Sequence, residues 1–419
     1  MSGPELITLG CRLNIAESDA MRALAADQDD LVIVNSCAVT AEAVRQTRKA
    51  IRRAKVARPN ARIVVTGCAA QIEPQTFARM PEVARVLGLA EKYAPSSFRH
   101  SRESGNPASS SPGQGSGIPA FAGMTESGAN FPTHARAFVE VQNGCDHRCT
   151  FCIIPYGRGD SRSVPAGLVV ERIKALVDRG FNEVVLTGVD VTSYGPDLPG
   201  SPSLGMLVDR ILRLVPNLPR LRLSSLDSVE IDDRLFDLLT GEPRMMPHLH
   251  LSLQSGDDMI LKRMKRRHSR AQAIDMVARL KAARPAIAIG ADIIAGFPTE
   301  TDAMFENSLR LIDECDIVYG HIFPYSPREG TPAARMPQVD PKISKARAKL
   351  LREASGKRQA AWLESLIGTV QNVLIERDGQ SGHAENFAGV RLSTPGDGNS
   401  IIPTRITAAS STQLTGIPA

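Results

Sequence analysis

The hydrophobic residues near the start of the chain fall into short runs rich in valine and isoleucine, and each run leads to a cysteine. Three such runs occupy residues 5–11, 31–37 and 62–68. Residues 41–57, between the second and third runs, carry Val44, Ile51 and Val56 among basic residues at helical spacing. Runs of this kind that alternate with helical segments indicate parallel strands covered by helices. The pattern predicts an open parallel α/β sheet domain over residues 1–96.

The same alternation continues through the middle of the chain. Helical spacing at residues 169–179, 204–214 and 271–283 separates apolar runs, which predict six strands, at 137–142, 183–188, 220–225, 248–254, 286–294 and 317–323. Six strand–helix units are typical of a partial parallel (βα)6 barrel, whose chemistry takes place at the carboxyl ends of the strands. We assign this core to residues 137–358.

Two regions carry a weaker pattern. Serine, glycine and proline make up over half of residues 101–130. Such a composition buries too little apolar surface to offset its ordering entropy, so we interpret residues 97–136 as a mobile surface linker. Near the end, residues 368–376 and 389–392 alternate like strands within a stretch rich in Gly, Ser, Thr and Pro. We expect a small antiparallel, β-barrel-like domain over residues 359–419.

Composition narrows the cellular setting. The chain has 419 residues, a net charge of +5 and seven cysteines, too few for a disulfide scaffold of this length. Its start lacks the features of a signal peptide, and no apolar run approaches the roughly 18 residues that span a bilayer. We therefore expect a cytoplasmic protein without membrane association. Residues 262–270 and 342–358 are strongly basic, which indicates either RNA contact or solvated helix faces.

The cysteines at the ends of the first three runs share one topological position. Ligands of open α/β sheets bind beyond the carboxyl ends of the strands, so we expect Cys11, Cys37 and Cys68 to converge. Three thiolates together indicate an iron–sulfur cluster with one iron lacking a protein ligand. Each cysteine alone also fits a small buried hydrophobe. The flanking Asn14, Asn35 and Gln71 either donate hydrogen bonds to the cluster sulfurs or serve as turn and cap residues.

A second trio of cysteines follows the first barrel strand. Cys145, Cys149 and Cys152 cannot all pair with one another as disulfides, because one would be left over, and they can hold three corners of a 4Fe-4S cluster. An open iron is where a metal centre performs chemistry. A zinc knuckle with His147 as fourth ligand and a redox-sensing thiol cluster are the alternatives.

The spacing Cys-x3-Cys-x2-Cys, with Phe151 before the last cysteine, resembles the signature of radical S-adenosylmethionine enzymes. The resemblance implies a core of the radical S-adenosylmethionine type. It also implies that this cofactor binds the open iron of the Cys145, Cys149 and Cys152 cluster and is cleaved there to a radical. Small and polar residues at the strand ends would then contact the cofactor, together with the aromatic ring: Phe151, Thr187, Gly188, Asp190, Ser225, Gln254 and Asp292.

The whole chain resembles the methylthiotransferase family. Residues 8–14, 35–40 and 152–162 look most like the branch that acts on N6-threonylcarbamoyladenosine in tRNA. This implies two 4Fe-4S clusters, with Cys11, Cys37 and Cys68 holding the auxiliary one. It also implies hydrogen abstraction at C2 of the adenine beside the anticodon, followed by sulfur insertion and methylation. The C-terminal domain resembles a degenerate RNA-binding domain, because the family pattern fades after Arg391.

The partners that the resemblance implies are a tRNA anticodon loop, an external electron donor and a sulfur donor, and we expect a monomer. Sister enzymes act on isopentenyladenosine in tRNA or on an aspartate of a ribosomal protein. A non-catalytic iron–sulfur sensor is a rival of a different class.

Overall fold

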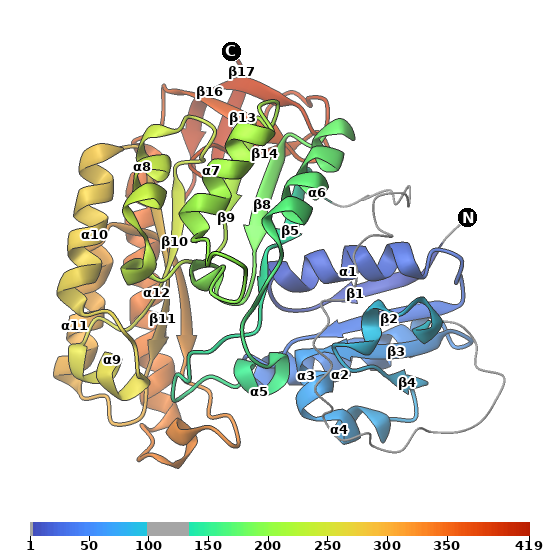
Figure 1. The fold of residues 1–419 in the computed structure, drawn as a ribbon. Helices are drawn as coiled ribbons and strands as arrows, with labels where there is room; N and C mark the ends of the chain where they lie inside the picture. The colour runs from blue at the N-terminus through green and yellow to red at the C-terminus, as the bar shows by residue number, and fades with distance from the viewer. Residues whose placement is uncertain (1–2, 99–133) are drawn as a thin grey trace. The chain divides into compact units, whose positions relative to one another are not determined.

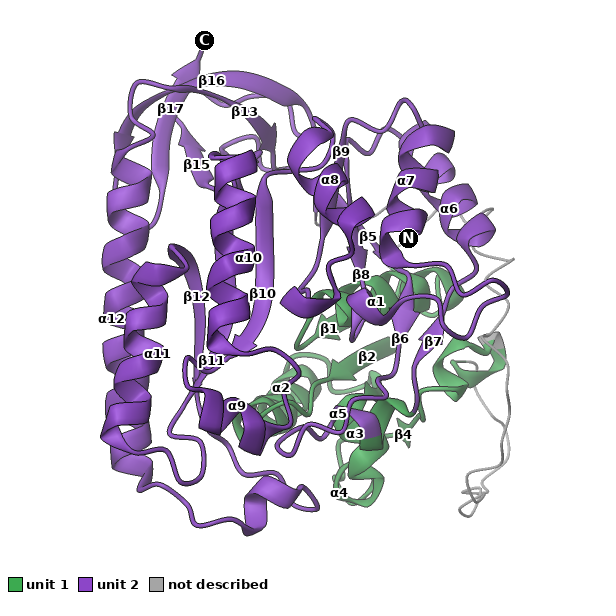
Figure 2. Cartoon of the chain, turned by 60° about the vertical axis from the view of Figure 1, so that its left-hand side comes forward, with its two compact units in different colours: residues 1–131, 156–159 green, residues 132–155, 160–419 purple. Residues whose placement is uncertain are grey.

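The computed structural model describes residues 3–98 and 134–419, so residues 99–133 of the linker predicted at 97–136 lie outside the described residues. The chain divides into two compact units. Unit 1 comprises residues 1–131 together with 156–159, and unit 2 comprises residues 132–155 and 160–419 (Figure 2). The short segment 156–159 thus belongs to unit 1, although it follows the second cysteine trio in sequence.

Unit 1 is an open parallel sheet, as the sequence predicts. Its strand order is β1-β2-β3-β4, and every neighbouring pair is parallel. All six residues of β2 are buried, and Met21, Ile33 and Phe98 pack in one apolar cluster. Because Phe98 is fully buried, the packing of this unit continues past residue 96. The strands are β1 (Glu5–Thr8), β2 (Leu31–Ser36), β3 (Arg62–Gly67) and β4 (Arg85–Val86).

Helices follow the first three of these strands: α1 (Arg12–Leu24), α2 (Ala41–Ala57), α3 (Cys68–Ile72) and α4 (Pro74–Ala78), with a 3-10 turn at η1 (Glu91–Tyr93). Helix α2 has the bounds that its periodicity predicts. It begins where the Thr40 hydroxyl accepts from the Ala43 amide at 3.1 Å. Its apolar stripe buries Val44 and Ile51, whereas Val56 is 82% exposed.

The core of unit 2 contains six parallel strands in chain order. They form the sheets β5-β8-β9 and β10-β11-β12, and bridges from Leu221 to Met245 and from Leu226 to Leu251 join the two. This is the predicted partial barrel. Its strands are β5 (Arg136–Glu140), β8 (Glu183–Thr187), β9 (Arg220–Leu223), β10 (His248–Gln254), β11 (Ala288–Ala295) and β12 (Ile317–Pro324).

Helices connect the barrel strands and run alongside them (Figure 1). They are α6 (Ala166–Asp178), α7 (Leu204–Leu214), α8 (Asp233–Gly241), α9 (Asp258–Met264), α10 (Arg270–Ala283) and α11 (Asp302–Glu314). After β5 comes the hairpin β6 (Gln142–Asn143) and β7 (Arg162–Ser163), which encloses the second cysteine trio and α5 (Ile154–Arg158). Within the described ranges, no helix combines the length and apolarity needed to cross a membrane.

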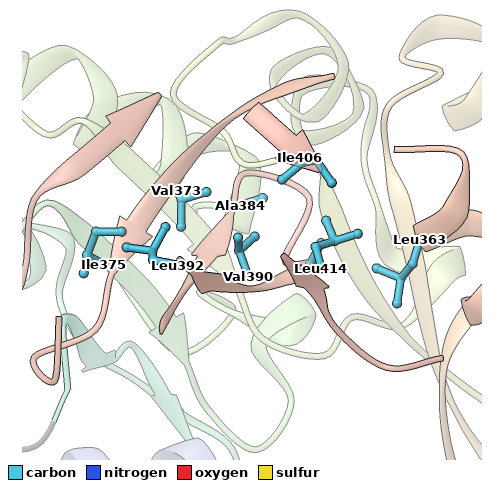
Figure 3. Packing of buried hydrophobic residues seen from close by; sticks show 9 residues of the cluster. Leu363, Val373, Ile375, Ala384, Val390, Leu392, Ile406 and Leu414 are labelled. Carbon is cyan, nitrogen blue, oxygen red and sulfur yellow. The ribbon is translucent and has the colours of Figure 1, made fainter. Parts of the chain in front are cut away.

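Helix α12 (Pro341–Glu364) leads from the barrel into the tail, so the boundary predicted at residue 358 falls inside a helix. Five strands then close into a small barrel of order β13-β14-β15-β17-β16. Its core includes Val373, Val390 and Leu414, and Leu363 of α12 packs against them (Figure 3). The strands are β13 (Val370–Ile375), β14 (Ser381–Ala384), β15 (Gly389–Leu392), β16 (Ile401–Ala409) and β17 (Leu414–Pro418).

The tail barrel is mixed, which corrects the antiparallel expectation. Strands β15 and β17 are parallel, with Val390 opposite Leu414, whereas the other neighbouring pairs are antiparallel. Sequence alternation predicts only β13 and β15. The other three strands are rich in glycine, threonine or proline, so their apolar period is too weak to recognise in isolation.

Candidate functional site

The first cysteine trio gathers at the carboxyl end of the unit 1 sheet. Cys11 caps α1 just after β1, Cys37 directly follows β2, and Cys68 directly follows β3. The backbone passes close to these side chains at Gly10, whose φ is +104° and whose added Cβ would lie 2.8 Å from Cys37 Cβ. The structure therefore brings together the three residues that the sequence places at equivalent strand ends.

Burial controls the protonation of this trio. Cys37 and Cys68 are buried, whereas Cys11 keeps an exposed surface. The pKa of Cys37 is raised to about 11, mainly by desolvation and to a lesser extent by the neighbouring Cys68 and Cys11. The free Cys37 thiol is therefore protonated at neutral pH, so a metal that binds it must displace the proton.

A buried charged group lies beside these cysteines, and sequence reasoning missed it. Arg158 Nε donates to Cys68 Sγ at 3.1 Å, and its Nη1 donates to Glu17 Oε1 at 2.8 Å. Lys92 Nζ lies 2.7 Å from the same carboxylate oxygen. Burial opposes ionisation of Glu17, but Arg158 and Lys92 overcome it and lower its pKa to about 2. The sequence signal for this buried group is Glu17, a carboxylate that lies four residues from both Leu13 and Met21 and therefore on the buried face of α1.

The amides expected to donate to cluster sulfurs point elsewhere. Asn14 Nδ2 donates to the carbonyl oxygens of Leu9 and Ser36, and its Oδ1 accepts from the Cys11 thiol at 3.6 Å. Asn35 Nδ2 donates to the Asn14 carbonyl at 3.0 Å. Gln71 Oε1 accepts from the Leu89 amide. Among the described side chains, it is Arg158 that donates to a sulfur of this trio.

The second trio occupies the loop after β6 in unit 2. The thiol of Cys145 lies 3.7 Å from Asp190 Oδ2, and the Cys152 amide donates to the Cys149 carbonyl at 3.1 Å. Desolvation raises the pKa of Cys145 to about 12, with a further contribution from Asp190. All seven cysteines are free, and the seventh, Cys315, is buried at the end of α11. The three thiols of this trio are a donor set that fits a 4Fe-4S cluster with one open iron.

Ion pairs hold the loop of the second trio. His147 Nε2 lies 2.8 Å from Asp190 Oδ2, and the hydrogen bond to this carboxylate raises the pKa of the imidazole. Ser193 donates to the same oxygen at 2.8 Å. The His147 ring nitrogen that would complete a zinc knuckle is thus directed at a carboxylate.

Part of the first basic run contacts this loop and the barrel beside it. Arg266 Nη1 lies 3.8 Å from Cys149 Sγ, and its Nη2 donates to Asp227 Oδ2 at 2.7 Å. The buried His268 contacts the Leu253 carbonyl, and Arg267 pairs with Glu230 at 2.6 Å. The side chains of Arg266 and His268 are thus held against the loop and the barrel, so the interpretation as a solvated helix face does not fit these two residues. RNA contact by residues 262–270 stays a prediction.

Three of the proposed cofactor residues have close contacts within the protein. Phe151 packs on an apolar cluster with Phe297, at a ring-centroid distance of 6.3 Å. Gly188 is constrained by the protein itself, because a Cβ there would lie 2.6 Å from the Gln142 carbonyl oxygen. Thr187 ends β8 and is buried, with its carbonyl accepting from the Val141 amide.

The remaining proposed contacts lie at strand ends or inside the barrel. Gln254 ends β10 with φ +66°, a backbone region that L residues seldom adopt and that clusters at functional sites. Ser225 follows β9 and is partly exposed. Asp292, on β11, lies 3.1 Å from His250 Nε2 and 3.5 Å from His321 Nδ1. Its carboxylate is thus already paired, and the two imidazoles lower its pKa against the opposing effect of burial.

Comparison with known proteins places this geometry in a family. A model of the radical SAM superfamily matches residues 139–312, and a model described as uncharacterized protein family UPF0004 matches residues 5–88. Threonylcarbamoyladenosine tRNA methylthiotransferase MtaB of Rickettsia prowazekii is 50% identical over 394 residues, which cover 93% of this chain and 91% of that protein. The chain belongs to the radical S-adenosylmethionine methylthiotransferases. Enzymes of this family transfer a methylthio group, and the superfamily uses a 4Fe-4S cluster and S-adenosylmethionine.

Other relatives lie further away. MtaB of Aquifex aeolicus is 34% identical, covering 88% of this chain and 91% of that protein. The tRNA-2-methylthio-N(6)-dimethylallyladenosine synthase of Cereibacter sphaeroides is also 34% identical, covering 98% and 97%. A solved structure of the radical S-adenosylmethionine methyltransferase TsrM from Kitasatospora setae, with cobalamin and a 4Fe-4S cluster bound, has a TM-score of 0.53 at 16% identity. It covers 80% of this chain and 74% of that chain, and it shares the fold.

Proposed function

We propose that this methylthiotransferase acts on tRNA, at C2 of the N6-threonylcarbamoyladenosine beside the anticodon. The observation that carries the proposal is the pair of cysteine trios, one at the sheet end of unit 1 and one in the barrel loop of unit 2. The 50% identity with an enzyme named for threonylcarbamoyladenosine favours this nucleoside over the dimethylallyl form, whose named enzyme is 34% identical.

The two trios would hold two clusters. Cys145, Cys149 and Cys152 would ligate the one that binds S-adenosylmethionine, and Cys11, Cys37 and Cys68 the auxiliary one. A cluster and S-adenosylmethionine, when bound, supply the radical chemistry that activates a C–H bond. The auxiliary cluster is supported by the three thiols and the cationic side chains beside them.

The protein's own groups orient the second trio. Asp190 fixes His147 and accepts from Ser193, which constrains the loop between Cys145 and Cys149. Arg266, anchored on Asp227, adds a positive charge near the Cys149 sulfur. We infer that the strand-end residues Thr187, Ser225 and Gln254 line the site that S-adenosylmethionine would occupy. The base must leave its stack to reach this site, because a stacked C2 is inaccessible.

Nucleoside profiling tests the substrate. Deleting the gene should remove the 2-methylthio form of threonylcarbamoyladenosine from tRNA, and the intact gene should restore it whereas Cys145→Ala and Cys68→Ala variants should not. Loss of a 2-methylthio isopentenyl nucleoside, or of a modified ribosomal-protein aspartate, would assign the chain to a sister reaction instead.

A second experiment separates the enzyme from an iron–sulfur sensor. The anaerobically reconstituted protein should form 5′-deoxyadenosine from S-adenosylmethionine under a strong reductant and hold about eight irons per chain, four for each cluster. Reconstituted protein that holds iron but cleaves no cofactor would favour the sensor.

A further inference from the structure

Three charged side chains of unit 1 are buried together. Glu17, Lys92 and Arg158 have side chains that are at most 1% exposed, and the carboxylate contacts both cations. A buried charge is costly unless an opposite charge compensates it. Arg158 extends from this group to a cysteine sulfur.

The cysteine trio lies beside the guanidinium of Arg158. Arg158 Nε is 3.1 Å from Cys68 Sγ, and the guanidinium also acts electrostatically on Cys11 and Cys37. An oxidised 4Fe-4S core carries two positive charges, so three thiolate ligands give the cluster one net negative charge. The guanidinium of Arg158 therefore lies beside a cluster of opposite charge.

The guanidinium is also held in one orientation. Its Nη1 donates to Glu17, its Nη2 donates to Asn14 Oδ1 at 2.9 Å, and its Nε is left directed at Cys68. Asn14 Oδ1 in turn accepts from the Cys11 thiol. A lysine at this position has the charge but not the planar arrangement of donors, so it cannot make all three contacts.

We propose that Arg158 is the positioning residue of the auxiliary cluster: it donates to the Cys68 ligand sulfur and places a positive charge beside the cluster. This rests on the proposed second cluster. Hydrogen bonds to ligand sulfurs and nearby positive charge both favour the reduced form of a cluster, so Arg158 raises its reduction potential. It also slows loss of iron, because it stabilises the ligated thiolate.

The test uses the full chain with Cys145, Cys149 and Cys152 changed to alanine, which leaves only the first trio. After anaerobic reconstitution, this parent should hold about four irons. Arg158→Gln should lower the midpoint potential of the cluster and speed iron loss to a chelator. Arg158→Lys should keep most of the iron but still lower the potential, because the charge remains and the directed hydrogen bond does not. Arg53→Gln, on the exposed face of α2, is the charge-matched control and should match the parent.

The outcomes separate the two proposals. A parent that holds no iron overturns the second cluster and with it the proposed function. A parent with about four irons, together with an Arg158→Gln variant of unchanged potential and chelator resistance, overturns only the role of Arg158. Circular dichroism checks that each variant folds. Should Arg158→Gln not fold, the potential of Arg158→Lys decides, and a value equal to the parent's overturns the proposal.

Discussion

At the scale of single residues, each cysteine trio has an arginine at one of its sulfurs. Arg158 lies against Cys68 in unit 1, and Arg266 lies against Cys149 in unit 2. A carboxylate fixes each guanidinium, Glu17 in the first case and Asp227 in the second. Guanidinium groups keep their charge when buried and offer several directed donors, so they suit both tasks. The two sites thus share one local arrangement, although their folds differ.

Gly10 provides a residue-scale prediction for the first trio. In Gly10→Ala, the alanine would have to adopt a φ of +104°. Its Cβ would lie 2.8 Å from Cys37 Cβ and 3.0 Å from Cys37 Sγ. The left-handed backbone alone costs about 1–2 kcal/mol, and the clash displaces a proposed ligand. We expect iron to fall from about eight to about four per reconstituted chain, as measured by iron and sulfide assays.

Gly180→Ala is the control for this substitution. Its φ is +85°, but nothing lies within 4 Å of the added Cβ. It should show the backbone penalty in a thermal melt and retain its iron. Full iron content in Gly10→Ala would contradict the placement of Cys37 as a ligand.

At the scale of elements, α12 uses its two faces differently. On one face, the buried Arg347 pairs with Glu300 at 2.8 Å and with Asp302 at 2.6 Å, and Arg358 pairs with Asp316. These ion pairs tie the helix to the barrel. On the other face, Lys342, Lys345 and Lys349 are exposed. The basic composition of residues 342–358 therefore serves both packing and a charged surface.

The exposed lysines yield a prediction for tRNA binding. Changing Lys342, Lys345 and Lys349 to glutamine should weaken tRNA affinity and make it less dependent on salt. The slope of the logarithm of the binding constant against the logarithm of the salt concentration should become shallower by about 0.7 to 0.9 for each phosphate that is no longer neutralised. Fluorescence anisotropy across a salt series measures both quantities. A matched variant with Lys174, Arg213 and Arg234 changed to glutamine removes the same charge from other helices and should keep the parent slope. Equal slopes in the two triple variants would rule out tRNA binding through α12.

At the scale of the whole molecule, unit 2 joins the barrel core to the tail through buried polar contacts. Arg220 donates to the Asn372 carbonyl at 2.8 Å, and Arg222 donates to the Glu385 carbonyl at 3.0 Å. The tail residue Phe387 lies 5.0 Å from the Arg222 guanidinium and 4.8 Å from the His248 ring. The tail barrel is therefore packed onto the strands of the core, so we expect the two to unfold together.

Glu376 makes this coupling dependent on pH. Burial opposes its ionisation, but His383 and Arg136 overcome it and lower the pKa of Glu376 to about 2. A carboxyl with a depressed folded-state pKa contributes stability that is complete above its unfolded pKa of about 4.5 and is lost as the pH falls toward 2. After allowance for solvent screening, the free energy of unfolding should fall by about 1 kcal/mol between pH 6 and pH 3 because of this group.

Urea unfolding at a series of pH values measures this effect. Glu376→Gln should be less stable than the parent at pH 6, and the difference should shrink as the pH approaches 3. Glu364→Gln, at the end of α12, is a control that should follow the parent curve. A constant difference between Glu376→Gln and the parent across this range would show that the carboxylate charge is not responsible.

The fold and the cysteines are largely predictable from the sequence. Strand and helix periods are local, so α2 and α7 have the bounds expected from spacing alone. The equivalent positions of Cys11, Cys37 and Cys68 follow from the parallel connections. Strands β14, β16 and β17 escape prediction because their apolar period is weak. The family resemblance implies that Gly188 contacts the cofactor, whereas in the structure the Gln142 carbonyl oxygen lies 2.6 Å from where a Cβ at Gly188 would be.

The amino-acid sequence was enough to predict the order of strands and helices, the parallel topology and the positions of both cysteine trios, because periodicity and spacing act over a few residues. Which charge meets which thiol depends instead on the folded chain. Arg158 and Cys68 are 90 residues apart, and Arg266 and Cys149 are 117 apart. No local pattern encodes such pairs. These pairs form because a buried charge is stable only where the tertiary fold places a compensating group beside it.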